Sequence, residues 1–275
     1  MKTMFAAAVA VALGCCGVAA PAHASTGMAE VAGVAFRAYS GASPSAHQAH
    51  FESLRSRGYR PITVSVSAGP KYAAVWVKSG GPAWISRSGL SEASFKARFD
   101  EYLAQGYQPI SVSATGPAGR ATFAALWEKR SERFFSRMGL TGAQFAAQNR
   151  KAHADGYVPV SIDMYGTPSD PRYVAAWRKS EGGGWYYSYG KSFAGHKSFF
   201  TKRTAEGYRP TAVAVGPGGT RFAAVYRKDG VRPWHHYIDT SASAYQRRFD
   251  SLVARGLRPV QVNIEDGVYA SVWTR

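Results

Sequence analysis

The sequence contains very little cysteine. Its 275 residues include two cysteines, Cys15 and Cys16, and both lie in an apolar stretch over residues 5–20. Small residues typical of a signal-peptidase site follow this stretch and end at Ala24. We therefore expect a signal peptide at 1–24, and a secreted mature chain that has no membrane span and no disulfide bond.

Acidic residues are scarce as well. The chain has 17 Asp and Glu residues against 34 Lys and Arg residues, a formal net charge of +17 and a pI near 10.0. Such a charge attracts polyanions. The basic residues are spread over the whole chain, however, so the arginine-rich composition of a bacterial source explains the charge equally well.

Familiar catalytic signatures are missing. The chain has no His-Glu-x-x-His motif and no Gly-x-Ser-x-Gly nucleophile elbow. Residues 190–192 resemble the end of a phosphate-binding loop, but Trp185 stands where that loop requires glycine. Asp163, Glu265 and Asp266 are better explained as surface acids than as a glycosidase pair. We expect no cofactor and no metal, and a non-catalytic role is favoured over an enzymatic one.

One phrase recurs along the chain. Gly-Tyr-x-Pro, or a close variant, begins at Gly58, Gly106, Gly156, Gly207 and Gly256. Each copy is followed by a phrase of the Tyr-Ala-Ala-Val-Trp type, which ends at Trp76, Trp127, Trp177, Tyr226 and Trp273. A period of about fifty residues that holds over five copies indicates a repeat protein.

Each repeat is predicted to contain one helix and three strands. In the second copy Ser91 caps a helix with apolar residues at helical spacing, and Gly106 ends it where a left-handed residue is needed. Pro109 prevents the helix from continuing, and residues 110–115 alternate between apolar and polar as a strand does. A turn leads to a second strand at 122–129, and a third strand precedes the next helix.

This order, helix–strand–strand–strand, leaves the two ends of the chain unequal. The last copy lacks a third strand, whereas residues 34–42 align with one and place Phe36 at its aromatic position. We therefore predict an α+β repeat fold whose five units form a closed, propeller-like ring, with the N-terminal strand completing the last repeat. The expected bounds are a short linker at 25–33 and a single domain at 34–275, with repeats at about 43–90, 91–140, 141–190, 191–240 and 241–275 and the closing strand at 34–42.

The two phrases and their spacing resemble a bacterial tandem-repeat domain. That domain is also found at the N-terminal side of secreted serine hydrolases of the polyglycine-hydrolase kind, where it precedes a β-lactamase-like catalytic domain. The resemblance covers residues 34–275. It implies a free-standing repeat domain that engages a substrate or a surface. No catalytic residue is carried over, because we expect neither the catalytic domain nor its Ser-x-x-Lys nucleophile here.

Two aromatic series follow the repeat. The residues that close the second strands, from Trp76 to Trp273, alternate with small residues and are predicted to be core. The third strands carry Phe36, Trp84, Phe134, Trp185 and Trp234. These rings either pack between strands and helices or form an exposed circle that stacks on sugars. On the helices, His47 and His196 replace an aromatic residue and are interpreted as half-buried substitutes for it.

Extra aromatic and histidine residues interrupt the repeat pattern on two of the third strands. Because binding is expected where a repeat departs from its scaffold pattern, we predict a ligand-binding surface here, flanked by Lys191, Lys197 and Arg232. Its residues are Trp185, Tyr186, Tyr187, Trp234, His235, His236 and Tyr237.

Three functions remain open at this point. The leading hypothesis is a secreted, non-catalytic binding or scaffold module for a cell-wall polymer, an acidic polysaccharide, or an extracellular protein or peptide. The first alternative is a hydrolase whose axial site is built from several repeats. The second is salt-sensitive binding of a polyanion such as nucleic acid.

Overall fold

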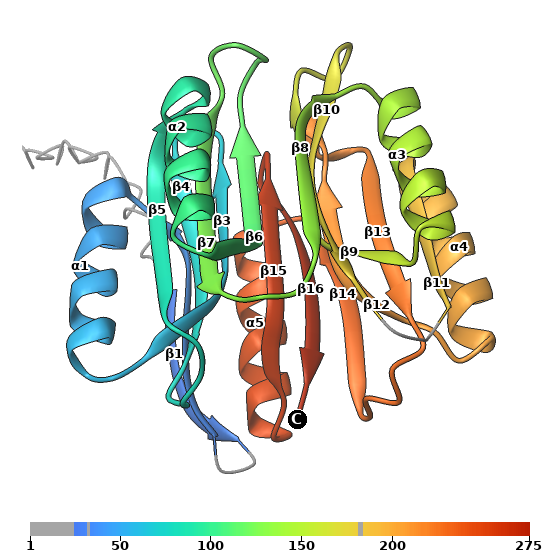
Figure 1. The fold of residues 1–275 in the computed structure, drawn as a ribbon. Coiled ribbons are helices and arrows are strands. Elements are labelled where there is room, and N and C mark those ends of the chain that lie inside the picture. Colours follow the sequence, from blue (N-terminus) through green and yellow to red (C-terminus); the bar gives the residue numbers. More distant parts are fainter. Residues whose placement is uncertain (1–24, 32–33, 181–183) are drawn as a thin grey trace, which may run out of the picture.

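The computed structural model describes residues 25–31, 34–180 and 184–275, so the predicted signal peptide lies outside the described residues. It contains five units, each with one helix and three antiparallel strands, as predicted (Figure 1). Within the described ranges, no helix has the length and apolar character needed to cross a membrane. The helices are α1 (Pro44–Ser56), α2 (Glu92–Ala104), α3 (Gly142–Ala154), α4 (Phe193–Ala205) and α5 (Ala242–Ala254).

Each unit forms its own sheet, in which the strand that comes last in sequence lies in the middle. The outer strands, which precede the helices, are β2 (Val34–Ala42), β5 (Trp84–Ser91), β8 (Phe134–Leu140), β11 (Trp185–Lys191) and β14 (Trp234–Asp239). The inner strands, which follow the helices, are β3 (Arg60–Ser67), β6 (Tyr107–Thr115), β9 (Tyr157–Gly166), β12 (Arg209–Val215) and β15 (Arg258–Glu265). The middle strands are β4 (Lys71–Val77), β7 (Thr122–Lys129), β10 (Pro171–Lys179), β13 (Phe222–Arg227) and β16 (Val268–Thr274).

The pairing of the outer strands corrects the predicted order of the unit. β2 pairs with β4, with Phe36 opposite Val77, and β5 pairs in the same way with β7 of the hairpin that follows it. The unit is therefore strand–helix–strand–strand, and β2 completes the first repeat rather than the last. A periodic sequence has no intrinsic starting point, so hydrogen bonding alone decides which strand joins which hairpin. Part of the expected linker also forms a strand, β1 (Ser25–Val31), which pairs with β2.

The predicted helix signals act as expected. Ser91 Oγ accepts a hydrogen bond from the Ser94 amide at 3.2 Å, which satisfies one of the free N–H groups at the start of α2. Gly106, after the end of α2, has a φ of +82°, a conformation that side chains with a Cβ rarely adopt.

The proline of the repeated phrase produces a β-bulge in every inner strand. In β6, Pro109 lies opposite Trp127 and Ser111 opposite Leu126, so Ile110 is an extra residue. Proline has no N–H to give to the strand ladder, and a bulge accommodates this loss. The five bulge residues line one central cavity of about 120 Å³; they are Ile62, Ile110, Val160, Thr211 and Val260.

The inner strands contact one another in cyclic order: β3 with β6, β6 with β9, β9 with β12, β12 with β15, and β15 with β3. They lie between the peripheral helices in Figure 1. Side chains bridge their backbones. Ser111 Oγ accepts from the Val64 amide at 3.2 Å, and Ser65 Oγ accepts from the Ile264 amide at 3.1 Å. The second of these bonds joins the last unit to the first.

The outer-strand aromatics pack against the helix of the preceding unit, so the core interpretation of this series holds. The centroid distances are 5.9 Å for Trp84–Phe51, 6.4 Å for Phe134–Phe99, 5.4 Å for Trp185–His153, 6.0 Å for Trp234–Phe200 and 6.3 Å for Phe36–Phe249. Phe36 and Trp185 are buried and the other three strand residues are half-buried. The middle-strand series is fully buried, as predicted.

Candidate ligand-binding groove

The structure divides the predicted binding residues among contacts with three different helices, because neighbouring residues on a strand point to opposite faces. Trp185 and Tyr187 on β11 face α3, where the Tyr187 hydroxyl donates to the Ala146 carbonyl at 3.3 Å. Tyr186 faces α4 instead, and the Arg203 guanidinium lies 4.0 Å from the centre of its ring.

The β14 residues are also divided. Trp234 and His236 face α4, and His236 Nε2 lies 2.9 Å from His196 Nε2. His235 and Tyr237 lie on the other face of the strand, and the Arg248 guanidinium of α5 is 3.8 Å from the Tyr237 ring. Of the seven residues, the three on β11 contribute to the lining of one groove, although the Tyr186 ring packs on Arg203 of α4, and the four on β14 lie elsewhere.

The groove runs between α3 and β11 and has a volume of about 760 Å³. Tyr187 and Tyr189 line it with rings that are 6.2 Å apart and nearly parallel, at 15°. Arg150, His153 and Lys191 are exposed along its sides. Flat aromatic faces bordered by basic groups suit a ligand that combines an apolar ring face with negative charge.

Asn149, which the sequence analysis did not single out, explains why this groove differs from its counterparts. The equivalent position of the other four helices holds phenylalanine: Phe51, Phe99, Phe200 and Phe249. Asn149 is fully buried; its Nδ2 donates to the Phe145 carbonyl at 3.0 Å, and its Oδ1 accepts from Trp177 Nε1 at 2.9 Å. Aligning the helices of the five repeats reveals this exchange in the sequence.

The strand side of the groove changes together with the helix side. Ser86 and Ser136 stand at the position of Tyr187 in the grooves beside α1 and α2. A Phe–Ser pair in those two units is therefore replaced by an Asn–Tyr pair between α3 and β11. The smaller helix residue leaves space for tyrosines that present both a ring face and a hydroxyl.

The charge of the groove also differs from that of its neighbour. The groove between α2 and β8 includes Glu92 and Asp100, whereas the charged side chains along the α3–β11 groove are basic. Burial raises the pKa of Tyr187, and the nearby Arg150 lowers it part of the way back. Tyr187 is therefore a neutral hydroxyl near pH 7, able to donate and to accept hydrogen bonds.

A Ser-x-x-Lys spacing does occur in this chain, at Ser188 and Lys191, contrary to the expectation from the sequence. The Ser188 side chain is only 3% exposed, and its Oγ makes no hydrogen bond to any described residue, Lys191 included. A serine nucleophile needs a base within hydrogen-bonding distance. The spacing therefore does not assemble a catalytic pair.

Two of the acids assigned to the surface are in fact buried on the axis between the inner strands. Asp163 is 2% exposed and accepts hydrogen bonds from the Ala114 and Met164 amides and from Asn263 Nδ2, at 2.8–2.9 Å. Glu265 is 5% exposed and accepts from Thr115 Oγ1 at 2.8 Å. The hydrogen-bond partners of Asp163 are thus groups of the protein on β6, β9 and β15, and its carboxylate connects these three inner strands. Across the described ranges, no three His, Cys, Asp or Glu side chains converge to hold a metal ion.

Comparison with known proteins identifies the repeat. One family model, described as polyglycine hydrolase-like, structural repeat, matches five consecutive segments, at 33–79, 81–130, 132–180, 182–229 and 231–275. Each matched segment contains one outer strand, one helix and one inner–middle hairpin, in agreement with the strand pairing. A search of curated proteins found no match.

Proposed function

Because the chain belongs to the polyglycine hydrolase-like structural repeat family, we propose that it is a secreted, non-catalytic binding module for an acidic extracellular polysaccharide. The proposal rests on the exchange of Phe–Ser for Asn–Tyr between α3 and β11, which gives the groove at this interface tyrosine faces with basic sides. Secretion is supported by the apolar stretch and the small-residue site that end at Ala24.

The scaffold of this module is a closed, propeller-like ring of five units. Support comes from the cyclic contacts of the inner strands and from the packing of Phe36 on Phe249, which repeats between units one and five the contact made between all other neighbours. Closure removes the exposed edge that an open stack of repeats leaves at each end. In the closed ring, each of the two units that form the groove also packs against its other neighbour. These contacts fix the position of the two units relative to each other.

The ligand class follows from the composition of the groove. Tyrosine faces such as those of Tyr187 and Tyr189 stack on sugar rings, and their hydroxyls bond to sugar hydroxyls. Arg150 and Lys191 supply charge-assisted hydrogen bonds to carboxylates. A uronic-acid polymer of a cell wall presents both features, whereas a neutral glycan presents only the first.

The test is a double substitution that gives this groove the composition of its neighbours. Asn149→Phe with Tyr187→Ser reproduces the Phe99 and Ser136 pair, so the fold has a precedent for it within the same chain. We expect the variant to keep its thermal transition and to lose co-sedimentation with insoluble polygalacturonate. The measurement is made at about 0.05 M and about 0.5 M salt, since screening weakens a purely electrostatic attachment.

Phe193→Ser is the matched control, because Phe193 is a 53% exposed aromatic residue outside the groove. It should bind as the unchanged protein does. Equal binding by the double variant and the unchanged protein would refute the groove as the ligand site. Binding of neutral cellulose with the same affinity would refute the acidic ligand class.

A further inference from the structure

The hairpins that join the inner and middle strands turn at the end of the molecule opposite the C-terminus (Figure 1). Residues from the hairpins of all five units line a pocket of about 540 Å³ at this end of the inner strands. Turn residues of the lining such as Gly69 and Pro168 are exposed, whereas Thr115 and Glu265 are buried. The pocket is therefore open at the turns, and its buried part lies at the last residues of β6 and β15.

Glu265 is an exception within the repeat. It stands six residues after the proline of its repeated phrase, where the other four units have no acid. Their residues at this position are Ser67, Thr115, Tyr165 and Gly216. Four units build the same inner strand without an acid, so the scaffold itself does not require one here.

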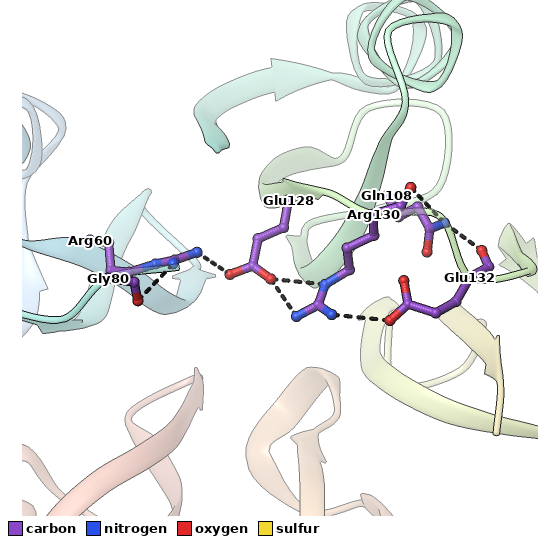
Figure 2. Close-up of polar contacts among 6 residues, drawn as sticks. All are labelled: Arg60, Gly80, Gln108, Glu128, Arg130 and Glu132. Atoms are coloured by element: carbon purple, nitrogen blue, oxygen red, sulfur yellow. Dashed lines mark hydrogen bonds and ion pairs between the residues drawn. The ribbon is translucent and has the colours of Figure 1, made fainter. Parts of the chain in front are cut away.

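Four acidic side chains are buried in the described part of the chain, and three of them have partners for both carboxylate oxygens. Glu128 is paired through one oxygen with Arg60 and through the other with Arg130 (Figure 2). Both oxygens of Asp239 accept from one arginine of α5 at 2.9 Å, and both oxygens of Asp163 accept from backbone amides. A buried carboxylate is costly unless its oxygens are bonded in this way.

Glu265 is the fourth buried acid, and one of its oxygens has no such partner. Its Oε1 accepts from Thr115 Oγ1 at 2.8 Å, whereas Oε2 is buried without a hydrogen bond to any described residue. The charged groups that act on it are both acids, Asp163 and Asp266. Burial and these two charges raise the pKa of Glu265 to about 8, so it holds a proton near pH 7. Because the terminal torsion of glutamate is soft, the carboxyl group can turn towards a ligand in the pocket.

A cation is the ligand that suits these acids. Glu265 and Asp266 are the acidic residues that line the pocket, and Asp266 Oδ2 accepts from the Gly218 amide at 2.6 Å. Arg120 is the one basic residue of the lining; it is exposed, and its guanidinium makes no ion pair within the described ranges. The acids are therefore accessible to a positive group that enters from the open side.

The geometry favours a primary ammonium group over other cations. A guanidinium fork matches both oxygens of a carboxylate, and Oε1 of Glu265 is already bonded. A calcium ion needs about six to eight oxygen ligands, whereas no three His, Cys, Asp or Glu side chains converge in the described ranges. An ammonium is a compact charge that one carboxylate oxygen can hold. Pro70 and Pro168 add apolar surface to the lining, against which a methylene stem can pack.

We propose that this axial pocket binds an alkylammonium group, as a lysine side chain carries, with Glu265 as its charged ligand. On binding, the Glu265 carboxyl group gives its proton to the solvent, and the resulting carboxylate pairs with the ammonium. Binding is therefore coupled to the release of a proton. The pocket shares no residue with the α3–β11 groove, so this proposal stands or falls independently of the proposed function.

The experiment titrates the isotope-labelled mature chain with Nα-acetyl-lysine amide and follows the backbone amides by NMR at pH 6, 7 and 8. The amides of Thr115 and Gly218 should shift in a saturable manner, because both residues line the pocket. The affinity should rise by up to about tenfold per pH unit below pH 8, since Glu265 then has less of a proton to lose.

Glu265→Gln keeps the shape of the side chain but cannot become negative. This variant should weaken binding at least about tenfold at pH 8 and abolish the pH dependence, because the charge-assisted contact is lost. Its thermal transition at pH 8 should be no lower than that of the unchanged protein, so unfolding does not explain the loss. Glu52→Gln is the matched control, since it removes the same charge from an exposed position on α1; it should change the affinity by less than about twofold.

Arg120→Gln removes the one cation of the lining and should raise the affinity, whereas a fall would overturn the assignment of a cationic ligand. Equal binding of the Nε-acetylated lysine amide would overturn the ammonium as the recognised group. Equal weakening by Glu265→Gln and Glu52→Gln would leave only general charge attraction. No saturable shift at pH 8 would overturn the site, and tighter binding of cadaverine than of the lysine amide would reassign the pocket to a free polyamine.

Discussion

Acidic side chains are few in this protein, and two of them are buried on the axis between the inner strands. The Asp163 carboxylate links three inner strands, because it accepts hydrogen bonds from β6, from its own strand β9 and from β15. Burial raises its pKa to about 6 and raises that of Glu265, which lies near it, to about 8. These acids stabilise the fold as hydrogen-bonding groups rather than as surface charges.

Glu265 should make the protein less stable as the pH rises from about 4.5 to about 8. Its pKa in the folded state is raised above the ordinary 4.5, so its contribution is fully present below about pH 4.5 and is lost as the pH rises towards about 8. Glu265→Gln cannot ionise, so we expect it to be more stable than the unchanged protein at pH 8.5 and similar at pH 5. The difference in the free energy of unfolding between the two proteins should grow by up to about 1.4 kcal/mol per pH unit. Urea unfolding at several pH values measures it, and parallel curves for the two proteins would contradict it.

The interface between a helix and the next outer strand is the element that varies most among the units. Aromatic rings from the helix and the strand meet there in the first two units, Asn149 and tyrosines line it in the third, and a histidine pair joins α4 to β14. His236 Nδ1 lies 3.0 Å from the Ser271 carbonyl, which can only accept, so this nitrogen carries the proton. His236 Nε2 then accepts from His196 Nε2–H. His196 Nδ1 is left as a buried, unprotonated nitrogen without a partner among the described residues.

This histidine pair should make the α4–β14 interface sensitive to acid. Burial lowers the pKa of His196 to about 3 and that of His236 to about 4. The unfolded chain therefore binds protons below about pH 6.5 that the native state excludes, and stability falls from there towards about pH 4. His196→Phe with His236→Ser reproduces the residues found at Phe95 and Ser136. We expect the melting temperature of this variant to fall less between pH 7.5 and pH 4.5 than that of the unchanged protein.

His153→Gln serves as the control for this comparison, because His153 is exposed on α3. It should keep the acid sensitivity of the unchanged protein. An equal loss of melting temperature in the double variant would assign that sensitivity to other groups.

At the scale of the whole molecule, the contact between the first and last units decides whether the chain behaves as a ring or as an open stack. Phe36 of β2 is fully buried against Phe249 of α5, in a core that also contains Tyr245 and Trp273. β1 also contacts α5. The two ends of the repeat array are thereby held together by the same kind of apolar packing that joins its neighbouring units.

Phe36→Ala tests this closure. Removing a fully buried phenylalanine should lower the free energy of unfolding by about 3–5 kcal/mol. In a closed ring the loss should appear in a single cooperative urea transition of the entire chain. Phe134→Ala, the same change at a half-buried internal interface, should cost less. A loss below about 1 kcal/mol for Phe36→Ala would mean that the two ends are not joined in solution.

The sequence alone determined the number of units, the elements in each unit and most of their boundaries, because these depend on local chemistry. Gly106 ends a helix, Pro109 lies near the start of an inner strand, and the period of about fifty residues follows from their recurrence. The middle-strand aromatics were also identified as core, since their alternation with small residues has one physical explanation.

Tertiary structure decided everything that depends on which segments become neighbours. The pairing of β2 with β4 set the order of the unit, and the convergence of the inner strands buried Asp163 and Glu265. The alternation of side chains along β11 and β14 separated binding residues that are adjacent in sequence. Aligning the repeats shows Asn149 in place of phenylalanine, but its effect on the groove depends on Tyr187, which is 38 positions away in the sequence. Local patterns specify elements, whereas contacts between distant segments specify sites.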